Sequence, residues 1–449
     1  MNPTRALALK LLLCSTAWLA GCASLPAPVP ATPTHALTDV ADARLARIAS
    51  AATPADKREL SGFRLLPEGE TAFNARIALA RRAEKSLDVQ YYLINQDDIG
   101  LQFLRELRDA AQRGVRVRLI VDDLYAAGED DLFAGLAEYP NVQVRIFNPL
   151  PARAGPFKMR LLFSLHEFGR INHRMHNKLF IADNSFSVSG GRNIANEYFM
   201  RSASANFIDL DVMSTGPVVR ELSTVFDSYW NSAQVYPIER LVSPLPADAA
   251  RARFDALVRD ASPRLAERAR DVLDATTVAH QLDTGELTQS FAPARVFADT
   301  PGKVAGLTTD EGRRTVTEQT LALFATARQQ VSIASPYFIP GQRGLAIMRA
   351  VGSTDENPRI VLVTNSLGST DEPLVHASYA RYRLDMLKAG VRIYELSPSL
   401  APRSGRLGNF GRSIGRLHAK AATIDKRIVF AKGGANLVDG LDAPPFQAP

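Results

Sequence analysis

The fold of this chain is decided by two stretches that share one pattern, His176-Asn177-Lys178-Leu179-Phe180-Ile181-Ala182-Asp183 and His418-Ala419-Lys420-Ala421-Ala422-Thr423-Ile424-Asp425. Each reads His-x-Lys-x-x-x-x-Asp, and the second begins 242 residues after the first. With seven histidines, 53 bases and 47 acids in 449 residues, chance predicts about 0.09 such matches, so two matches are not accidental. The pattern therefore predicts a duplicated unit built around this motif.

The residues around the two motifs repeat in the same order. The expected elements are strands at 87–93, 115–124, 331–339 and 360–367, helices at 100–113 and 343–351, and a matching pair of segments at 142–149 and 390–398. Tyr92 corresponds to Tyr337, and Leu124 corresponds to Leu367. Strands that alternate with amphipathic helices predict an α/β fold with partly parallel sheets. After the first motif we expect a strand at 207–213 and a helix at 217–232.

The spacing within each motif suits chemistry on a phosphodiester. Residues two apart on a strand point to the same face, so each motif should project its histidine and lysine together. The lysines, Lys178 and Lys420, can stabilise the negative charge that grows on the phosphate oxygens. One histidine can form a phosphohistidine and the other can act as acid and base. We expect Asp183 and Asp425 each to orient a histidine. No metal or other cofactor is needed for this scheme.

Together with Gly190-Gly191-Arg192-Asn193, the duplicated motif resembles the phospholipase D superfamily. The resemblance implies two phospholipase D-like α/β/α sandwich domains related by a pseudo-twofold axis, with the active site at their interface. It assigns Gly191 and Asn193 to binding of the phosphate. Glu197 is a weaker supporting candidate, and Asn436 is the doubtful counterpart of Asn193 in the second copy.

Further segments narrow the resemblance to bacterial cardiolipin synthases of the C type, notably 148–149, 174–178 and 371–376. This implies transfer of a phosphatidyl group through a phosphohistidine, with phosphatidylglycerol or phosphatidylethanolamine as donor and phosphatidylglycerol as acceptor. By family habit, His176 is the nucleophile and His418 the acid and base, although the spacing does not distinguish them. Hydrolysis by a phospholipase D remains an alternative, since only the acceptor changes. A nucleic-acid substrate is not expected.

The N-terminus predicts export and lipidation. Arg5 and Lys10 precede an apolar run, as in a signal peptide. The sequence Leu19-Ala20-Gly21-Cys22 resembles the lipobox of bacterial lipoproteins, which implies cleavage before Cys22 and its acylation. A plain signal peptide or an uncleaved anchor are the alternatives. The expected protein is a membrane lipoprotein facing the periplasm, and Ala23 favours the outer membrane.

Composition limits the remaining possibilities. The chain is 46% hydrophobic and 22% charged with a net charge of +6, which excludes a wholly disordered or collagen-like protein. Both cysteines, Cys14 and Cys22, lie near the N-terminus, so a disulfide framework in the folded part is excluded. The expected division is a signal peptide at 1–21, a Pro/Ala-rich tether at 22–58, a first domain at 59–235, a helical insert at 236–292 and a second domain at 293–449. We expect a monomer.

The second copy is expected to be incomplete. The first copy continues through a further strand and helix, whereas the segment after Phe430 resembles neither. This predicts a truncation or a frameshift after Phe430, which would leave a sheet edge unpaired. An inactive truncated lipoprotein is therefore a further alternative.

Overall fold

The computed structural model describes residues 25–26, 32–126, 128–153, 155, 157–242, 246–259, 261, 276–306, 315–352, 359–398 and 413–431. The predicted signal peptide, Cys22, Asn436 and the segment after residue 431 lie outside these ranges. In the part of the chain that is described, no helix is long and apolar enough to cross a membrane.

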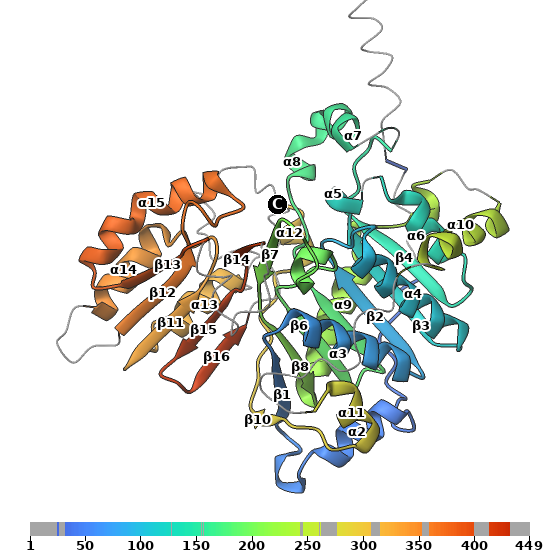
Figure 1. Ribbon diagram of the computed structural model, residues 1–449, viewed down its shortest axis with the longest axis horizontal. Helices are drawn as coiled ribbons and strands as arrows, with labels where there is room; N and C mark the ends of the chain where they lie inside the picture. Colours follow the sequence, from blue (N-terminus) through green and yellow to red (C-terminus); the bar gives the residue numbers. More distant parts are fainter. Residues whose placement is uncertain are drawn as a thin grey trace, which may run out of the picture.

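The first domain is built on a nine-stranded sheet (Figure 1). Its order is β10-β1-β8-β6-β5-β2-β3-β4-β9. The strands are β1 (Ser61–Leu66), β2 (Ser86–Tyr91), β3 (Arg116–Asp122), β4 (Val142–Phe147), β5 (Leu179–Ala182), β6 (Phe186–Gly190), β8 (Asp211–Thr215), β9 (Val235–Pro237) and β10 (Ser290–Ala292). The pairs β2–β3 and β3–β4 are parallel, and the other pairs are antiparallel.

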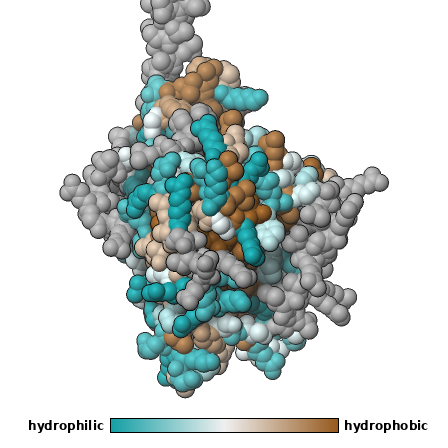
Figure 2. All heavy atoms as spheres, turned by 90° about the vertical axis from the view of Figure 1, so that its left-hand side faces the viewer, coloured by the Kyte–Doolittle hydropathy of each residue, from teal (hydrophilic) through white to brown (hydrophobic). Residues whose placement is uncertain are grey.

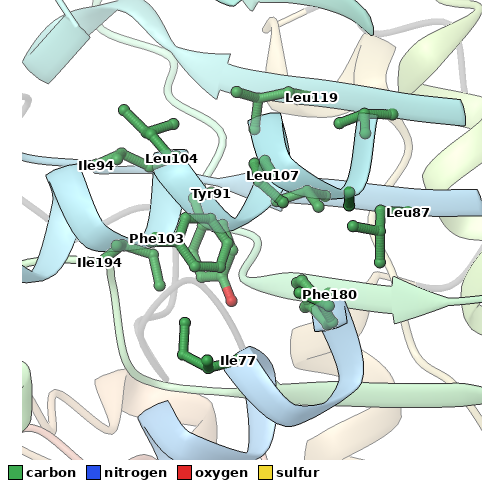
Figure 3. Packing of buried hydrophobic residues seen from close by; sticks show 14 of the residues in the cluster. Ile77, Leu87, Tyr91, Ile94, Phe103, Leu104, Leu107, Leu119, Phe180 and Ile194 are labelled. Carbon is green, nitrogen blue, oxygen red and sulfur yellow. The ribbon is translucent and has the colours of Figure 1, made fainter. Parts of the chain in front are cut away.

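Helices cover both faces of this sheet. The helices of the first domain are α3 (Gly69–Arg82), α4 (Asp98–Gln112), α5 (Asp123–Ala126), α6 (Asp130–Ala137), α7 (Phe157–Phe163), α8 (Phe168–Ile171) and α9 (Pro217–Trp230). On one face, Phe103 of α4 packs against Tyr91 and Phe180 of the sheet (Figure 3). On the other face, Phe226 and Trp230 of α9 belong to a second core cluster. The first domain is therefore an α/β/α sandwich, because both faces of its strands carry apolar residues.

The second domain contains a five-stranded sheet in the order β13-β12-β11-β15-β16. Its elements are α13 (Val316–Phe324), β11 (Gln330–Ala334), α14 (Gly341–Gly352), β12 (Arg359–Asn365), α15 (Pro373–Lys388), β13 (Arg392–Leu396), β15 (Ala421–Ile424) and β16 (Ile428–Ala431). The three helices share one core cluster with Ile333 and Leu362 and so cover one face of the sheet. On the opposite face, Val363, Tyr394 and Val429 are exposed.

The predicted duplication is confirmed by the strand order. In the first domain the strands run β6-β5-β2-β3-β4, and in the second their counterparts run β16-β15-β11-β12-β13. Strands β2, β3 and β4 are parallel to one another, as are β11, β12 and β13. The strand within each motif, β5 or β15, pairs antiparallel with the first strand of its set, β2 or β11. The same sequence order has therefore produced the same topology twice.

The strand predicted at 207–213 is in fact two strands. Strand β7 (Ala205–Ile208) pairs in parallel with β14 (Ile414–Leu417) of the second domain, while β8 returns to the large sheet. The chain leaves one sheet for another at Asp209 and Leu210. Pattern alone did not reveal this break, because the alternation of residues continues through it. The β7–β14 pair joins the two domains (Figure 1).

Two segments outside the repeat are more ordered than expected. The segment expected as a tether includes α2 (Arg44–Ala52), and Thr34 within it accepts a hydrogen bond of 2.8 Å from the Trp230 indole. The expected helical insert does contain α10 (Ala247–Arg259) and α11 (Val278–Thr284). It also supplies strand β10 and most of β9, the two edges of the large sheet, which corrects the purely helical expectation. The short helix α12 (Pro301–Val304) follows.

Candidate active site

Both histidine–lysine pairs lie just outside the strands. His176 and Lys178 directly precede β5, and His418 and Lys420 lie between β14 and β15. The expected position within a strand is therefore wrong by a few residues. In the first motif, the backbone just before His176 is held by the end of a neighbouring strand. Asp122, the last residue of β3, accepts a hydrogen bond of 2.8 Å from the Met175 amide.

The second domain uses the same device with a different residue. Asn365 ends β12 and its side chain accepts a hydrogen bond of 2.9 Å from the Leu417 amide. The Asn365 amide group also donates to the Leu417 carbonyl at 2.8 Å. In each domain, the residue just before the histidine is thus held by the end of a parallel strand. Sequence reasoning did not identify Asp122 or Asn365.

The two motif aspartates do not orient the histidines. The Asp183 carboxylate accepts hydrogen bonds of 2.7 Å and 2.9 Å from the amides of Lys85 and Ser86, at the start of β2. The Asp425 carboxylate accepts bonds of 2.7 Å and 2.8 Å from the amides of Gln329 and Gln330, at the start of β11. Each aspartate therefore fixes the turn of the motif hairpin to the central strand. This corrects the expectation that they act on the histidine rings.

Each lysine lies over a tyrosine ring of its own domain. The Lys178 ammonium is 5.3 Å from the Tyr92 ring centre, and the Lys420 ammonium is 5.3 Å from the Tyr337 ring centre. Burial, followed by the charge of Lys420, lowers the pKa of Lys178 to about 7. Burial lowers the pKa of Lys420 to about 8. The site therefore concentrates cationic charge that an anionic ligand would stabilise.

His418 is bound by a carboxylate from the other domain. Its Nδ1 atom lies 2.6 Å from Oδ2 of Asp209, which occupies the break between β7 and β8. Burial disfavours the charged carboxylate, but His418 and Arg192 hold the pKa of Asp209 below its usual value. This residue was missed, because in the sequence it lies inside an apparently continuous strand.

Gly191 packs directly against the Asp209 carboxylate. A Cβ atom on Gly191 would lie 2.0 Å from Oδ1 of Asp209, so only glycine admits this carboxylate. The neighbouring Arg192 is buried and donates to the backbone carbonyls of Leu66 and Asp209. The glycine turn thus places the residue that holds His418.

His176 has different surroundings. Its ring stacks on Tyr92 with centroids 4.2 Å apart, and within the described residues no hydrogen bond to the ring is found. Burial, followed by the positive charges of Lys178 and Lys420, holds the pKa of His176 well below its usual value. Burial and Lys420 also lower the pKa of His418, while Asp209 opposes that shift. His176 is therefore the more strongly neutral of the two rings.

Asn193 and Glu197, expected to bind or support the phosphate, differ in how close they lie to the motif histidines and lysines. Asn193 is buried and donates a hydrogen bond of 2.9 Å to the Tyr198 hydroxyl, while its Oδ1 atom has no partner among the described residues. The Tyr198 ring is 5.2 Å from the His418 ring, so Asn193 borders the site. Glu197 makes no hydrogen bond or ion pair with the motif histidines or lysines of the described chain. No three His, Cys, Asp or Glu side chains of the described segments form a metal site.

Two α/β units that bring a histidine–lysine pair each to one interface define the phospholipase D-like class. Residues 77–230 and 320–440 match the family described as cardiolipin synthase, PLD-like domain. The chain belongs to this family.

Individual relatives agree with this assignment. The chain is 35% identical over 393 residues to cardiolipin synthase C of Escherichia coli, covering 86% of this chain and 80% of the relative. It is 26% identical over 384 residues to cardiolipin synthase A of Pseudomonas fluorescens, covering 83% of this chain and 61% of the relative. The crystal structure of phosphatidylserine synthase from Haemophilus influenzae matches with a TM-score of 0.51 at 14% identity, over 86% of this chain and 81% of that one. That structural likeness concerns the fold alone.

Proposed function

We propose that this protein transfers phosphatidyl groups between phospholipids and forms cardiolipin through a phosphohistidine. The observation that carries the proposal is the shared site, in which Asp209 of the first domain binds His418 of the second. The charges of Lys420 and His418 also act on His176, so both motifs contribute to one electrostatic environment. The family supports a phospholipid substrate.

In the first step, an imidazole nitrogen of His176 attacks the phosphorus of the donor lipid. The P–O bond to the donor head group breaks, and His418 gives its proton to the departing alkoxide. Lys178 and Lys420 stabilise the charge on the non-bridging oxygens. In the second step, the hydroxyl of a phosphatidylglycerol head group attacks phosphorus, the P–N bond to His176 breaks, and His418 takes the hydroxyl proton.

The surroundings of the two rings support this division of roles. His176 is held neutral, and a neutral imidazole has the free electron pair that a nucleophile needs. His418 has Asp209 on Nδ1, which favours its protonated form, and its Nε2 atom, 3.4 Å from the Lys420 ammonium nitrogen, exchanges the proton. Phosphatidylethanolamine or phosphatidylglycerol serves as donor. The chain acts as a monomeric lipoprotein, acylated at Cys22, on the periplasmic face of a bacterial membrane, the outer membrane being favoured.

One lipid assay tests the proposal. The purified full chain is incubated with phosphatidylglycerol, alone and together with phosphatidylethanolamine, and the products are separated. Cardiolipin is expected, and His176→Ala should abolish it. The surface variant Asp385→Asn on α15 is the matched control and should remain active. Phosphatidic acid as the sole product would replace transfer by hydrolysis, and the absence of any product would establish the inactive alternative.

A further inference from the structure

A short segment that precedes the first motif in the chain exposes large apolar side chains. It consists of α7 and the single turn of 3-10 helix that follows (Leu165–Glu167), and we call it the α7 segment. Five of its side chains are between 36% and 55% exposed: Phe157, Met159, Leu162, Phe163 and Leu165. Monomeric soluble proteins rarely gather so many apolar residues on one exposed element, and such patches mark interaction sites.

The amphipathic character of this segment is inverted. Its buried residues are the polar Arg160 and Ser164. Arg160 pairs with Asp130 of α6 at 2.5 Å and donates a hydrogen bond of 2.8 Å to the Gly155 carbonyl. The Ser164 hydroxyl accepts a hydrogen bond of 3.3 Å from the Ala152 amide. Polar contacts therefore attach the segment to the domain and turn its apolar residues outward, the reverse of an ordinary surface helix.

The α7 segment projects from the first domain above the interface with the second (Figure 1). Seen from the side of the second domain, hydrophobic residues gather at this upper end of the molecule (Figure 2). The chain continues through α8 towards the first motif, and His176 follows nine residues after Glu167. The one acid between residues 157 and 170 is Glu167, which pairs with Arg170, whereas Lys158 is exposed among the apolar side chains.

We propose that the α7 segment inserts into the surface of an anionic bilayer and presents the site to its lipids. Outward-facing Phe, Met and Leu beside an exposed lysine match the acyl boundary and the anionic head groups of a membrane surface. A protein partner of matching shape is the competing occupant. The proposal deepens the proposed function, but its test requires no turnover.

The test measures binding of the full chain to vesicles. Cys22→Ala is introduced throughout so that acylation cannot mask the contact. Vesicles of phosphatidylglycerol and phosphatidylcholine are sedimented with the protein, and vesicles of phosphatidylcholine alone provide the comparison. We expect Leu162→Ser with Phe163→Ser to weaken binding at least about tenfold, because two large apolar side chains no longer enter the bilayer.

The matched control is Leu384→Ser with Leu387→Ser on α15, two residues that are 60% and 50% exposed away from the α7 segment. The control pair should bind as the parent does, and both pairs should keep the parent circular dichroism. Equal binding by the parent and the Leu162/Phe163 pair would overturn the proposal, as would an equal loss in both pairs. A parent that ignores phosphatidylglycerol vesicles would overturn it in favour of a protein partner.

A second and independent observation concerns Asp371, which lies between β12 and α15. Its Oδ2 atom accepts the hydrogen bond of the Tyr337 hydroxyl, while its buried Oδ1 atom has no partner within the described residues. The Tyr337 ring is 6.2 Å from the His418 ring and carries the Lys420 ammonium on its face. The Asp371 residue is half-buried, so it is not sealed inside the core.

A carboxylate so close to a phosphate site is unfavourable for the phosphate itself, because like charges repel. It does suit a neighbouring hydroxyl, since an ionised carboxylate accepts hydrogen bonds and cannot donate them. A buried oxygen without a donor also loses free energy that a bound hydroxyl would restore. A head group with two neighbouring hydroxyls can attack phosphorus through one of them and donate a hydrogen bond to Oδ1 through the other.

We propose that Asp371 binds the hydroxyl adjacent to the attacking hydroxyl of a glycerol head group and so selects transfer over hydrolysis. This rests on the proposed function. The attacking oxygen forms its bond to phosphorus, the P–N bond to His176 breaks, and the proton passes to His418. Asp371 takes part in no bond change, so it is a specificity residue that contacts the acceptor.

The test compares glycerol with propan-1-ol as acceptor for the phosphatidyl group, with phosphatidic acid measured in the same reaction. The parent should prefer glycerol. Asp371→Asn, which can still accept from Tyr337, should lower the ratio of glycerol transfer to hydrolysis about tenfold and leave phosphatidic acid formation in place. Asp385→Asn on α15 should keep the parent ratio. An active Asp371→Asn protein with the parent ratio would overturn this proposal alone, whereas an inactive parent would overturn the proposed function with it.

Discussion

The two copies of the motif share eight-residue spacing and strand order, yet they surround their histidines differently. His418 lies against Asp209 at 2.6 Å, while His176 stacks on Tyr92 at 4.2 Å. In both copies the motif aspartate binds backbone amides, so the difference does not arise within the motif. It arises because β7 crosses to the second domain and leaves Asp209 at the interface. The duplication therefore supplies two histidines in equivalent positions, and the contact between the domains gives their rings different partners.

The largest effect should separate the two histidines. His176→Ala should lower turnover at least about 10⁴-fold and remove the covalent adduct, because no nucleophile remains. His418→Ala should lower turnover by roughly 10² to 10⁴, since only proton transfer is lost. Rapid quenching with labelled phospholipid, followed by peptide mapping, should find the adduct on His176 in the His418→Ala protein. An adduct on His418 in the parent would reverse the assignment.

A second experiment removes the charge that distinguishes His418. Asp209→Asn should lower kcat by roughly 10² to 10³, because the ring loses the partner that favours its protonated form. Without this carboxylate the pKa of His418 falls further, so less of the acid is present at neutral pH. Because the first step needs the protonated ring, the limb on which kcat falls with rising pH should move to lower pH.

Gly191→Ala provides a matched variant for the same contact. This variant keeps Asp209 itself, but its new Cβ atom would lie only 2.0 Å from Oδ1 of Asp209, so the carboxylate must move away. It should therefore reproduce most of the Asp209→Asn loss and its shift in pH profile. A Gly191→Ala protein with parent kinetics would show that the contact with Asp209 is unnecessary.

The lysines should give a smaller, pH-dependent effect. Burial lowers the pKa of Lys178 to about 7 and that of Lys420 to about 8, so both lose their charge as the pH rises through this range. The value of kcat/KM, which reports the free enzyme, should therefore fall above about pH 7. The arginine in Lys178→Arg stays charged, so the fall in kcat/KM should begin at a higher pH, set by the pKa of Lys420. An unchanged limb in Lys178→Arg would exclude Lys178 as its source.

The smallest effect on chemistry should come from the motif aspartates, which act on stability. Asp183→Ala removes the acceptor of buried amides at the start of β2 and should cost about 2 to 3 kcal/mol in the free energy of unfolding. Asp425→Ala should cost less, because Asp425 is not fully buried. Urea unfolding measures both. The residual folded proteins should keep the parent pH profile, and a shifted profile would give these aspartates a role on the rings.

The sequence predicts much of the architecture. The repeat predicted the paired helices and strands, and their order is the same in both domains. The strand predicted at 207–213 was wrong, because the pattern of alternating residues is unaffected when a chain passes from one sheet to another. The role given to Asp183 was wrong for a related reason. Spacing along a strand defines a shared face, but it does not say whether a side chain meets a ring or a backbone amide.

The sequence by itself determined the duplication, the α/β units and the two histidine–lysine pairs, because these depend on local periodicity and on residues close together in the chain. Only the tertiary structure decided which side chains contact each histidine ring. Asp209 and His418 are far apart in the sequence and come together through the β7–β14 pair, and Tyr92 reaches His176 from β2's end. Such contacts leave no periodic signal, since their partners are chosen by the packing of whole domains.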